Sequence, residues 1–594
     1  MSGGRTARRG GGFAVLLVAL SIAVRLVYFA QAGHGPLLAL NGWDQSDMAF
    51  FDRWARVIAA GDWLTDRPLH PQHAWHRDVA RVYLEAHPEE RAALAAAGHG
   101  SPEEASAEIW NRWYGGKTFH QEPLYPYLVA LTYRLLGPDP RFVLAWQLAI
   151  GVAANLLVYL IAVRLFPPPV PVLAGALALL CSPLLFYEMV LLRESLIVAA
   201  GLLLVWLVLR AMDRPSALSW GAVGLAGGLS LLLKSSFVLF LAPVAAVLAC
   251  RPRPSWRETA RLVAALAGGV ALALAPAVAR NVVVGVSPLS LSSVGAVTFV
   301  NANVEDYPAE GGFYVSLKHA PAILGASEGR LLPAARGALG THAGVSSHLR
   351  QLLAKLAVAG HWYEVPDNCS FYLYRLYAGI LSLPVTFFVL SPLALVGLAL
   401  AVAVPRAWPL FLLALSSLAT MLVFYPSSRF RAPLMAAVIP FAALALVEAA
   451  RLLGARRWAA GLACVGAVAL AFAWTSRPLA GDPVPLRGDD CRLPFLLYYA
   501  PRMEAAQARG DWAGAAAPMV EAASFEPGFV RAMSAATPPL SERAYQCGFV
   551  YASAHANAAH ALRQAGRAEE AAPHERETAR LDAALAEARR RAGR

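Results

Sequence analysis

A short segment near the N-terminus, residues 42–65, carries the first side chains that could perform chemistry. Asp47 is followed at helical spacing by Phe51, Trp54 and Ile58, so the segment is predicted to form a helix that lies flat in a membrane interface. Asp47 falls in the first turn, where the positive end of the helix dipole favours an ionised carboxylate. The residues alone leave two interpretations open. Either Asp47 is functional, or it has no functional role and lies on a helix that Asp44 or Ser46 caps.

The elements that must position this segment are set by an apolar composition. Of 594 residues 57% are hydrophobic and 15% are charged, with a mean hydropathy of +0.48, whereas soluble domains carry roughly 25% charged residues. A soluble enzyme is therefore excluded, and the net charge of +12 does not indicate a nucleic-acid partner. Apolar runs long enough to cross a bilayer predict an all-α multi-pass membrane protein with about eleven spans. The predicted spans are 13–30, 142–166, 171–187, 195–212, 220–233, 237–250, 262–279, 378–404, 408–424, 434–450 and 458–474.

The orientation of the spans follows from the basic residues in short loops. Arg164, Arg210, Arg406 and the basic loop 251–261 fit one side, which the positive-inside rule makes cytoplasmic. We read Leu124 to Leu136 as an interfacial helix, because counting it as a span would export that loop. The N-terminus is then cytoplasmic, and the first span is either retained or a cleaved signal segment. Three polar regions fall outside an inner (plasma) membrane: 31–141, 280–377 and 477–594.

Two sequence segments resemble membrane glycosyltransferases of the GT-C fold, such as protein O-mannosyltransferases and lipid A aminoarabinose transferases. One is the first outer segment, in which Asp47 and Phe51 match an acidic and an aromatic position of the family. The other is FHQEPLYPYLVALTYRLLG, residues 119–137, which is similar to a segment leading into the family's second span. The chain departs from the pattern at Met48, where the family often has Glu. The resemblance implies a GT-C bundle over 1–476. From Pro494 onward the composition changes to Ala, Arg and Glu with few long apolar runs, which predicts a separate helical domain over 477–594.

The resemblance also implies a reaction at the outer face. The donor would be a polyprenyl-phosphate-linked sugar, transferred with inversion to the hydroxyl of an unknown glycan, lipid or protein acceptor. Asp47 would act as general base. Some family members have a second acid before the prolines of this segment, where His120, Gln121 and Glu122 are equal candidates here, and Asp44 is a further catalytic candidate. No cofactor is firmly predicted, and the partners are the lipid-linked sugar, the acceptor and membrane lipids.

A polyprenyl-phosphate donor requires cations at the outer membrane boundary. Five basic residues depart from the positive-inside trend at the predicted outer ends of spans, and Arg25 is a possible sixth. Each could instead snorkel to the headgroups, but their convergence on one face favours a shared phosphate pocket. The five are Lys234, Arg429, Arg431, Arg280 and Arg193. Glu194, beside Arg193, would pair with it or help orient the acceptor.

Two other features carry less specific predictions. His70, His73 and His76 recur every third residue, but Pro71 disfavours a helix there, and we predict no metal site. In the tail, Cys491 and Cys547 lie on the oxidising side, where a disulfide between them is plausible. The tail also contains two weak tetratricopeptide-like helical pairs, for which a generic helical hairpin is the alternative.

Two other classes of function compete with the transferase. A multi-pass transporter or flippase of lipid-linked glycan would fit the number of spans. Transporters tend to have internal repeats and ionisable residues near mid-membrane, whereas here the ionisable residues lie mostly at span ends. A noncatalytic assembly subunit is the third possibility, and in that case Asp47 would be replaceable.

Overall fold

The computed structural model describes residues 3–250, 255–478, 484–536 and 539–591. Within these ranges the regular elements are helices, and no strand is formed. The basic positions 251–254 of the predicted cytoplasmic loop lie outside the described residues. The chain divides into two compact units. The first comprises residues 1–25, 44–367 and 383–479, and the second comprises residues 26–43, 368–382 and 480–594. Two segments earlier than the predicted boundary at 477 therefore belong to the second unit.

Each of the eleven predicted spans contains an apolar helix. Among the described residues, seven helices are long and apolar enough to cross a membrane, and four shorter apolar helices accompany them. This confirms an all-α multi-pass membrane fold. The long helices are α1 (Gly3–Ala32), α8 (Pro140–Leu165), α11 (Glu194–Asp213), α14 (Trp256–Val283), α21 (Trp408–Val423), α22 (Ser428–Gly454) and α23 (Trp458–Thr475), and the shorter ones are α9 (Val170–Leu179), α12 (Ala217–Leu233), α13 (Val238–Cys250) and α20 (Phe387–Ala401).

In two predicted spans the helix differs in extent from the prediction: in one it ends earlier, and in the other it begins later. The third predicted span, 171–187, is interrupted after Leu179, and a new short helix, α10 (Ser182–Phe186), begins beside Pro183. The eighth, 378–404, becomes regular only after Pro384, with Thr386 at the N-cap of α20. Both differences have the same cause, since proline lacks the N–H that would continue a preceding helix.

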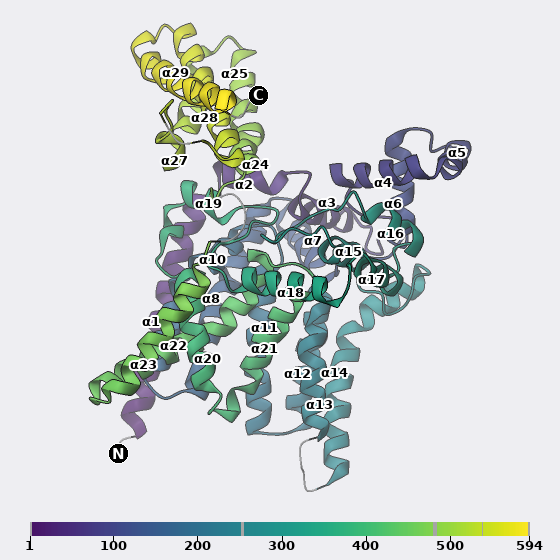
Figure 1. Ribbon diagram of the computed structural model, residues 1–594. Helices are drawn as coiled ribbons and strands as arrows, with labels where there is room; N and C mark the ends of the chain where they lie inside the picture. Colours follow the sequence, from purple (N-terminus) through teal and green to yellow (C-terminus); the bar gives the residue numbers. More distant parts are fainter. Residues whose placement is uncertain (1–2, 251–254, 479–483, 537–538, 592–594) are drawn as a thin grey trace. The chain divides into compact units, whose positions relative to one another are not determined.

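The helical bundle of the first unit has two chemically different ends. At one end, Asp213, the last residue of α11, pairs with Arg164 at 2.6 Å and also with Arg406. Three of the short connections that were predicted to be cytoplasmic therefore meet there. Glu194 is the first residue of the same helix, and at its end of the bundle lie α3 (Asp47–Ala59) and α7 (Leu124–Leu136) (Figure 1). The side of the membrane that each end faces stays a prediction.

The helices α3 and α7 pack against each other. Ser46, one of the two predicted caps, accepts a hydrogen bond from the backbone N–H of Ala49, so Asp47 is the first helical residue. The apolar face of α3 is buried and includes Phe51, whose ring meets that of Tyr125 on α7 at 5.0 Å. α7 has 13 residues and is not one of the candidate spans among the described residues.

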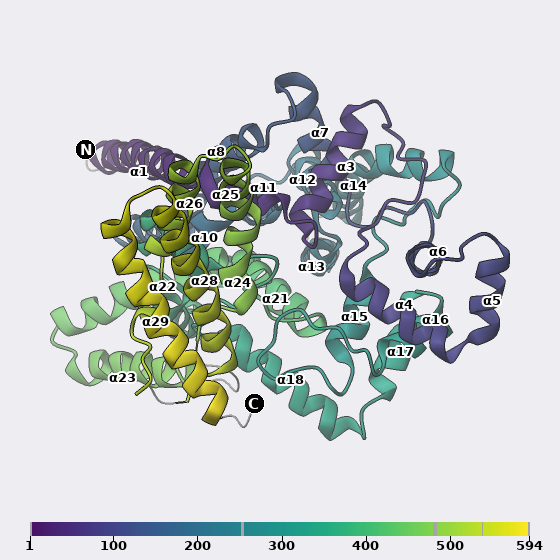
Figure 2. The ribbon, with the colours of Figure 1, turned by 90° about the horizontal axis from the view of Figure 1, so that it is seen from above.

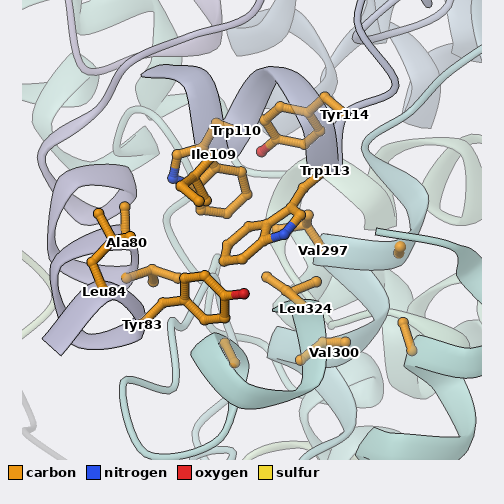
Figure 3. Packing of buried hydrophobic residues seen from close by; sticks show 14 of the residues in the cluster. Ala80, Tyr83, Leu84, Ile109, Trp110, Trp113, Tyr114, Val297, Val300 and Leu324 are labelled. Carbon is orange, nitrogen blue, oxygen red and sulfur yellow. The ribbon is translucent and has the colours of Figure 1, made fainter. Parts of the chain in front are cut away.

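Parts of the two loops that were predicted to lie outside the membrane fold together into one body within the first unit. Figure 3 shows Trp110 and Trp113 of the first loop packed with Val297, Val300 and Leu324 of the second. Seen from above, α4 lies beside α16, and α15 beside α17 (Figure 2). The helices of this body are α4 (Ala74–Ala86), α5 (Pro88–Ala96), α6 (Pro102–Trp113), α15 (Gly295–Asn303), α16 (Ala320–Ser327) and α17 (Leu331–Gly340), and α18 (Val345–Gly360), which follows them, packs against α21. The shared core fixes the second loop over the end of the bundle that holds α3.

The second unit is also helical. Gly510 and Gly566 adopt positive φ of 73° and 74° in the turns before α26 and α29, a conformation that glycine adopts without strain. Cys491 and Cys547 are buried, and their sulfurs lie 2.6 Å apart. Their proximity suits the predicted disulfide, which stays a prediction. The helices are α2 (Gly35–Ala39), α19 (Phe371–Tyr377), α24 (Gly488–Pro494), α25 (Ala500–Gln507), α26 (Trp512–Ser524), α27 (Gly528–Arg531), α28 (Glu542–Gln564) and α29 (Ala568–Arg591).

Candidate active site

Asp47 is held by two side chains that come from distant parts of the sequence. Its Oδ2 lies 2.5 Å from Nη1 of Arg429, and its Oδ1 accepts a hydrogen bond of 2.9 Å from Nε2 of Gln121. Burial by itself would raise the pKa of the Asp47 carboxyl. The adjacent Arg429 guanidinium outweighs burial and holds that pKa at about 2. Asp47 is therefore a carboxylate at every physiological pH, as its place at a helix N-terminus favours.

Arg429 is the centre of a buried cluster of carboxylates. It is the second residue of α22, and its Nε lies 3.1 Å from Asp367 and 3.4 Å from Glu194. Asp367 is fixed in turn by a hydrogen bond of 3.1 Å from the Tyr425 hydroxyl. A guanidinium buried to this depth, with a side chain 10% exposed, is retained only where partners offset its desolvation.

A second ion pair lies beside this cluster. Nη1 of Arg193 contacts Oε2 of Glu122 at 2.5 Å, and Oε1 of Glu122 accepts the backbone N–H of Ser235 at 2.7 Å. Burial would raise the pKa of Glu122, but Arg193 and the Ser235 N–H lower it below its ordinary value. Glu122 thus ties the segment before α7 to the residue before α11 and to the connection between α12 and α13.

Lys234 differs from the two arginines because no carboxylate neutralises it directly. It ends α12, and its Nζ lies 3.7 Å from the centre of the Phe430 ring. Arg193, Glu194, Arg429 and Glu122 all lie within electrostatic range of it, but among the described residues none forms an ion pair with it. A half-buried ammonium with only a ring as direct partner can accept an incoming anion without first breaking a salt bridge.

Two other predicted phosphate ligands, Arg280 and Arg431, form contacts outside the cluster around Arg429. Nε and Nη2 of Arg280 donate to the carbonyls of Leu64 and Thr65 at 2.7 and 2.8 Å. Nη2 of Arg431 pairs with Glu364 at 2.7 Å. We therefore do not place Arg280 and Arg431 in the phosphate site.

Arg25 likewise does not join the cluster. It forms a buried ion pair of 2.6 Å with Glu188. A Cβ on Gly151 would lie 2.1 Å from the Glu188 carboxylate, so the absence of a side chain at Gly151 makes room for this pair inside the bundle.

The other two catalytic candidates, Asp44 and His120, lie in positions less suited to acid–base chemistry than that of Asp47. Asp44 is exposed in the turn before α3. His120 is buried against the rings of Phe50 and Tyr114, with centroids 5.1 and 4.6 Å away. Burial lowers the pKa of His120 to about 3, so its imidazole is neutral at physiological pH. The backbone carbonyl of His120 accepts a hydrogen bond of 3.0 Å from Ser292 Oγ, so His120 helps to hold the loop that contains Ser292.

The three spaced histidines do not converge on one point. His70 Nε2 meets Oδ1 of Asn111 at 2.5 Å, and His76 Nε2 meets the Tyr114 hydroxyl at 3.1 Å. His73 lies close enough to Asp47 to interact with its charge. Within the described part of the chain, no group of three or more histidine, cysteine or acidic residues could hold a metal ion.

With this geometry in place, one comparison bears on the family. Residues 120–279 match the family of dolichyl-phosphate-mannose-protein mannosyltransferases. The match confirms, over this part of the chain, the predicted resemblance to protein mannosyltransferases, and it supports a membrane glycosyltransferase of the GT-C type. The matched segment contains Glu122, Arg193, Glu194 and Lys234, whereas Asp47 and Arg429 lie outside it.

Solved structures give two further similarities. The oligosaccharyltransferase of Archaeoglobus fulgidus is 14% identical, with 79% of this chain and 57% of that chain covered and a TM-score of 0.39. The chain therefore spans less than two thirds of that protein. ArnT of Cupriavidus metallidurans is 15% identical, with 73% and 76% covered and a TM-score of 0.27. A search of curated proteins found no match.

Sequence reasoning missed Asp367 and the position of Tyr425. Asp367 lies near the end of the second outer loop, in VPDNCS, where no periodic pattern or motif marks an acidic residue. Its role depends on a hydrogen bond to Tyr425, 58 positions away, and a contact at that separation has no local signature. YPSSRFRAP marks the segment that contacts Asp47, but the sequence could not distinguish Arg429, which pairs with Asp47, from Arg431, which pairs with Glu364.

Proposed function

We propose that this protein is a membrane glycosyltransferase that moves a sugar from a polyprenyl-phosphate donor to an acceptor hydroxyl at the outer face of the plasma membrane. The proposal rests on one observation: Asp47 contacts Arg429, beside Arg193 and Lys234, at one end of the bundle. This cluster combines one carboxylate able to accept a proton with cations able to hold a phosphate. The basic connections around Asp213 would face the cytoplasm.

The reaction assigns a separate task to each group. The acceptor oxygen attacks the anomeric carbon, the bond from that carbon to the phosphate oxygen breaks, and the configuration inverts. Asp47 takes the proton of the acceptor hydroxyl as general base, and polyprenyl phosphate leaves with the bonding electrons. Lys234, Arg193 and Arg429 stabilise the negative charge that develops on the leaving phosphate.

The contact between Asp47 and Arg429 suggests how the site changes when the donor binds. A carboxylate with a pKa of about 2 is a weak base, because efficient general bases have a pKa near the operating pH. A donor phosphate would compete with Asp47 for the Arg429 guanidinium. Release of Asp47 from its strongest partner would raise its pKa and strengthen it as a base when the substrate is present.

A transfer assay with a matched control tests the proposal. Purified full-length protein would be given a radiolabelled polyprenyl-phosphate sugar and a membrane extract as acceptor source. We expect Asp47→Asn to lower the transfer rate by about 10²–10⁴-fold, the contribution typical of a general base. Asp52→Asn is the control, because Asp52 lies on the same helix but pairs with Arg56.

The results of this assay separate the competing functions. Asp52→Asn should transfer at close to the wild-type rate. Equal transfer by the wild type and Asp47→Asn would remove Asp47 from the reaction and leave a noncatalytic role for it. Concentrative uptake of a solute by proteoliposomes, without transfer, would instead favour the transporter.

A further inference from the structure

A polar cavity distinct from the cluster around Asp47 lies in the loop 280–377. It has a volume of about 270 Å³ and lies between the segment after α15, the turn before α18, and α18 itself. Its lining is mostly polar: Glu305, Tyr307, His342, Arg350, Gln351 and Lys355. One aromatic ring together with several planar hydrogen-bonding groups is a lining suited to a polyhydroxylated ligand.

The wall of this cavity is held rigidly. Nζ of Lys355 is buried and donates to Oδ1 of Asn303 at 2.9 Å and to the carbonyls of Leu422 and Phe424 at 3.2 and 2.7 Å. Nε2 of His342 contacts the Asn303 carbonyl at 2.9 Å. These contacts anchor α18 to the ends of α15 and α21, and the turn before α18 to the end of α15, so the cavity is formed in advance of any ligand.

Two side chains of the lining retain unused hydrogen-bonding capacity. Nε2 of Gln351 donates to the Val304 carbonyl at 2.7 Å, which fixes the amide, and its buried Oε1 has no partner among the described residues. A buried acceptor of this kind costs free energy unless a ligand or water donates to it. Arg350 is exposed at the rim and forms no ion pair with any described residue. A ligand could therefore receive hydrogen bonds from Arg350 and donate one to Gln351.

The cavity also adjoins the candidate active site. Tyr307 packs in one apolar cluster with Tyr425 and Phe430. Tyr425 donates to Asp367, which in turn contacts Arg429. One layer of aromatic side chains therefore separates the cavity from the charges around Asp47.

We propose that this cavity binds one sugar ring of a glycan acceptor. The volume lies just below the roughly 300–1,000 Å³ of ordinary ligand pockets, so it suits a single ring better than an extended peptide. Tyr307 offers a ring face, and Arg350 and Gln351 offer the donors and the acceptor that sugar hydroxyls require. That the bound sugar belongs to the acceptor rests on the proposed transferase function, whereas the binding itself does not.

Direct binding tests the proposal without any transfer step. Saturation-transfer NMR on the purified full chain would use glucose, mannose, galactose, N-acetylglucosamine and glucuronic acid, each alone. At least one should bind, and Arg350→Ala and Gln351→Ala should weaken it at least five-fold. Arg336→Ala is the matched control, since Arg336 is exposed on α17 outside the cavity, and it should bind as the wild type does.

The outcomes distinguish this proposal from the transferase proposal. Asp47→Asn should keep full sugar binding even where it abolishes transfer. The cavity proposal is overturned if none of the five sugars binds, or if Arg350→Ala and Gln351→Ala both bind like the wild type. It is also overturned if a threonine-rich peptide binds there and no sugar does.

Discussion

At the scale of single residues, the site depends on how three cations differ in their partners. Arg429 contacts three carboxylates and Arg193 contacts Glu122, whereas Lys234 faces the Phe430 ring. Arg429 must give up part of these contacts to bind a phosphate, and Lys234 need not. We infer that Lys234 makes the first contact with the donor and that Arg429 follows as it separates from Asp47.

This order predicts how donor use depends on pH. Burial is the main cause that lowers the pKa of the Lys234 ammonium below its ordinary value, so Lys234 loses its proton at a lower pH than an exposed lysine. The kcat/KM for the donor reports groups of the free enzyme and should fall as the pH rises through the Lys234 pKa. Lys234→Arg should move that fall to higher pH, because arginine stays protonated.

On the acid side of the same pH profile, titration of Asp47 should not change kcat/KM for the donor. Its pKa of about 2 leaves Asp47 ionised throughout the range from about pH 5 to 8 in which such an assay is run. His120 stays neutral over the same range. The alkaline side of the profile tests Lys234. If kcat/KM fell at the same alkaline pH in the wild type and in Lys234→Arg, the role of Lys234 in binding the donor would be refuted.

At the scale of elements, the sequence predicted the helices better than their contacts. Runs of apolar residues located all eleven helices, because burial in lipid or protein demands apolar side chains along a whole span. Prolines in two predicted spans, Pro183 and Pro384, displaced helix ends. The sequence placed Lys234 and Arg429 at the correct ends of helices, but partners such as Asp367 depend on tertiary packing that no local pattern encodes.

Close packing of α12 on α14 explains one group of glycines. A Cβ on Gly224 would lie 2.0 Å from the Leu266 carbonyl, and one on Gly269 would lie 2.3 Å from the Gly221 carbonyl. Small residues at such positions let membrane helices approach closely. This packing supports Lys234, which ends α12.

We expect Gly224→Ala to destabilise the protein by about 1–3 kcal/mol, the usual cost of overpacking a tight contact. Gly466→Ala is the control, because a Cβ there meets nothing within 4 Å. Thermal unfolding of the detergent-solubilised protein would compare them. Equal midpoints for both variants would show that α12 and α14 are not held in close contact.

At the scale of the whole molecule, the two outer loops are a joint structure within the first unit. The core shared by α4, α6, α15 and α16 holds the second loop near α3, and the cavity proposed for a sugar lies in that loop. The distribution of basic residues among the short connections predicted that both loops lie on one side of the membrane. It could not predict that they share a core, because this core joins residues more than 180 positions apart in the chain.

The most direct test of the central claim is a structure of the full-length protein with polyprenyl phosphate bound. We predict that the phosphate lies within ion-pair distance of Lys234 and Arg193, that Arg429 turns toward it, and that Asp47 no longer contacts Arg429. A phosphate bound instead at Arg280 or Arg431, with the contact between Asp47 and Arg429 intact, would contradict the assignment of this cluster as the active site.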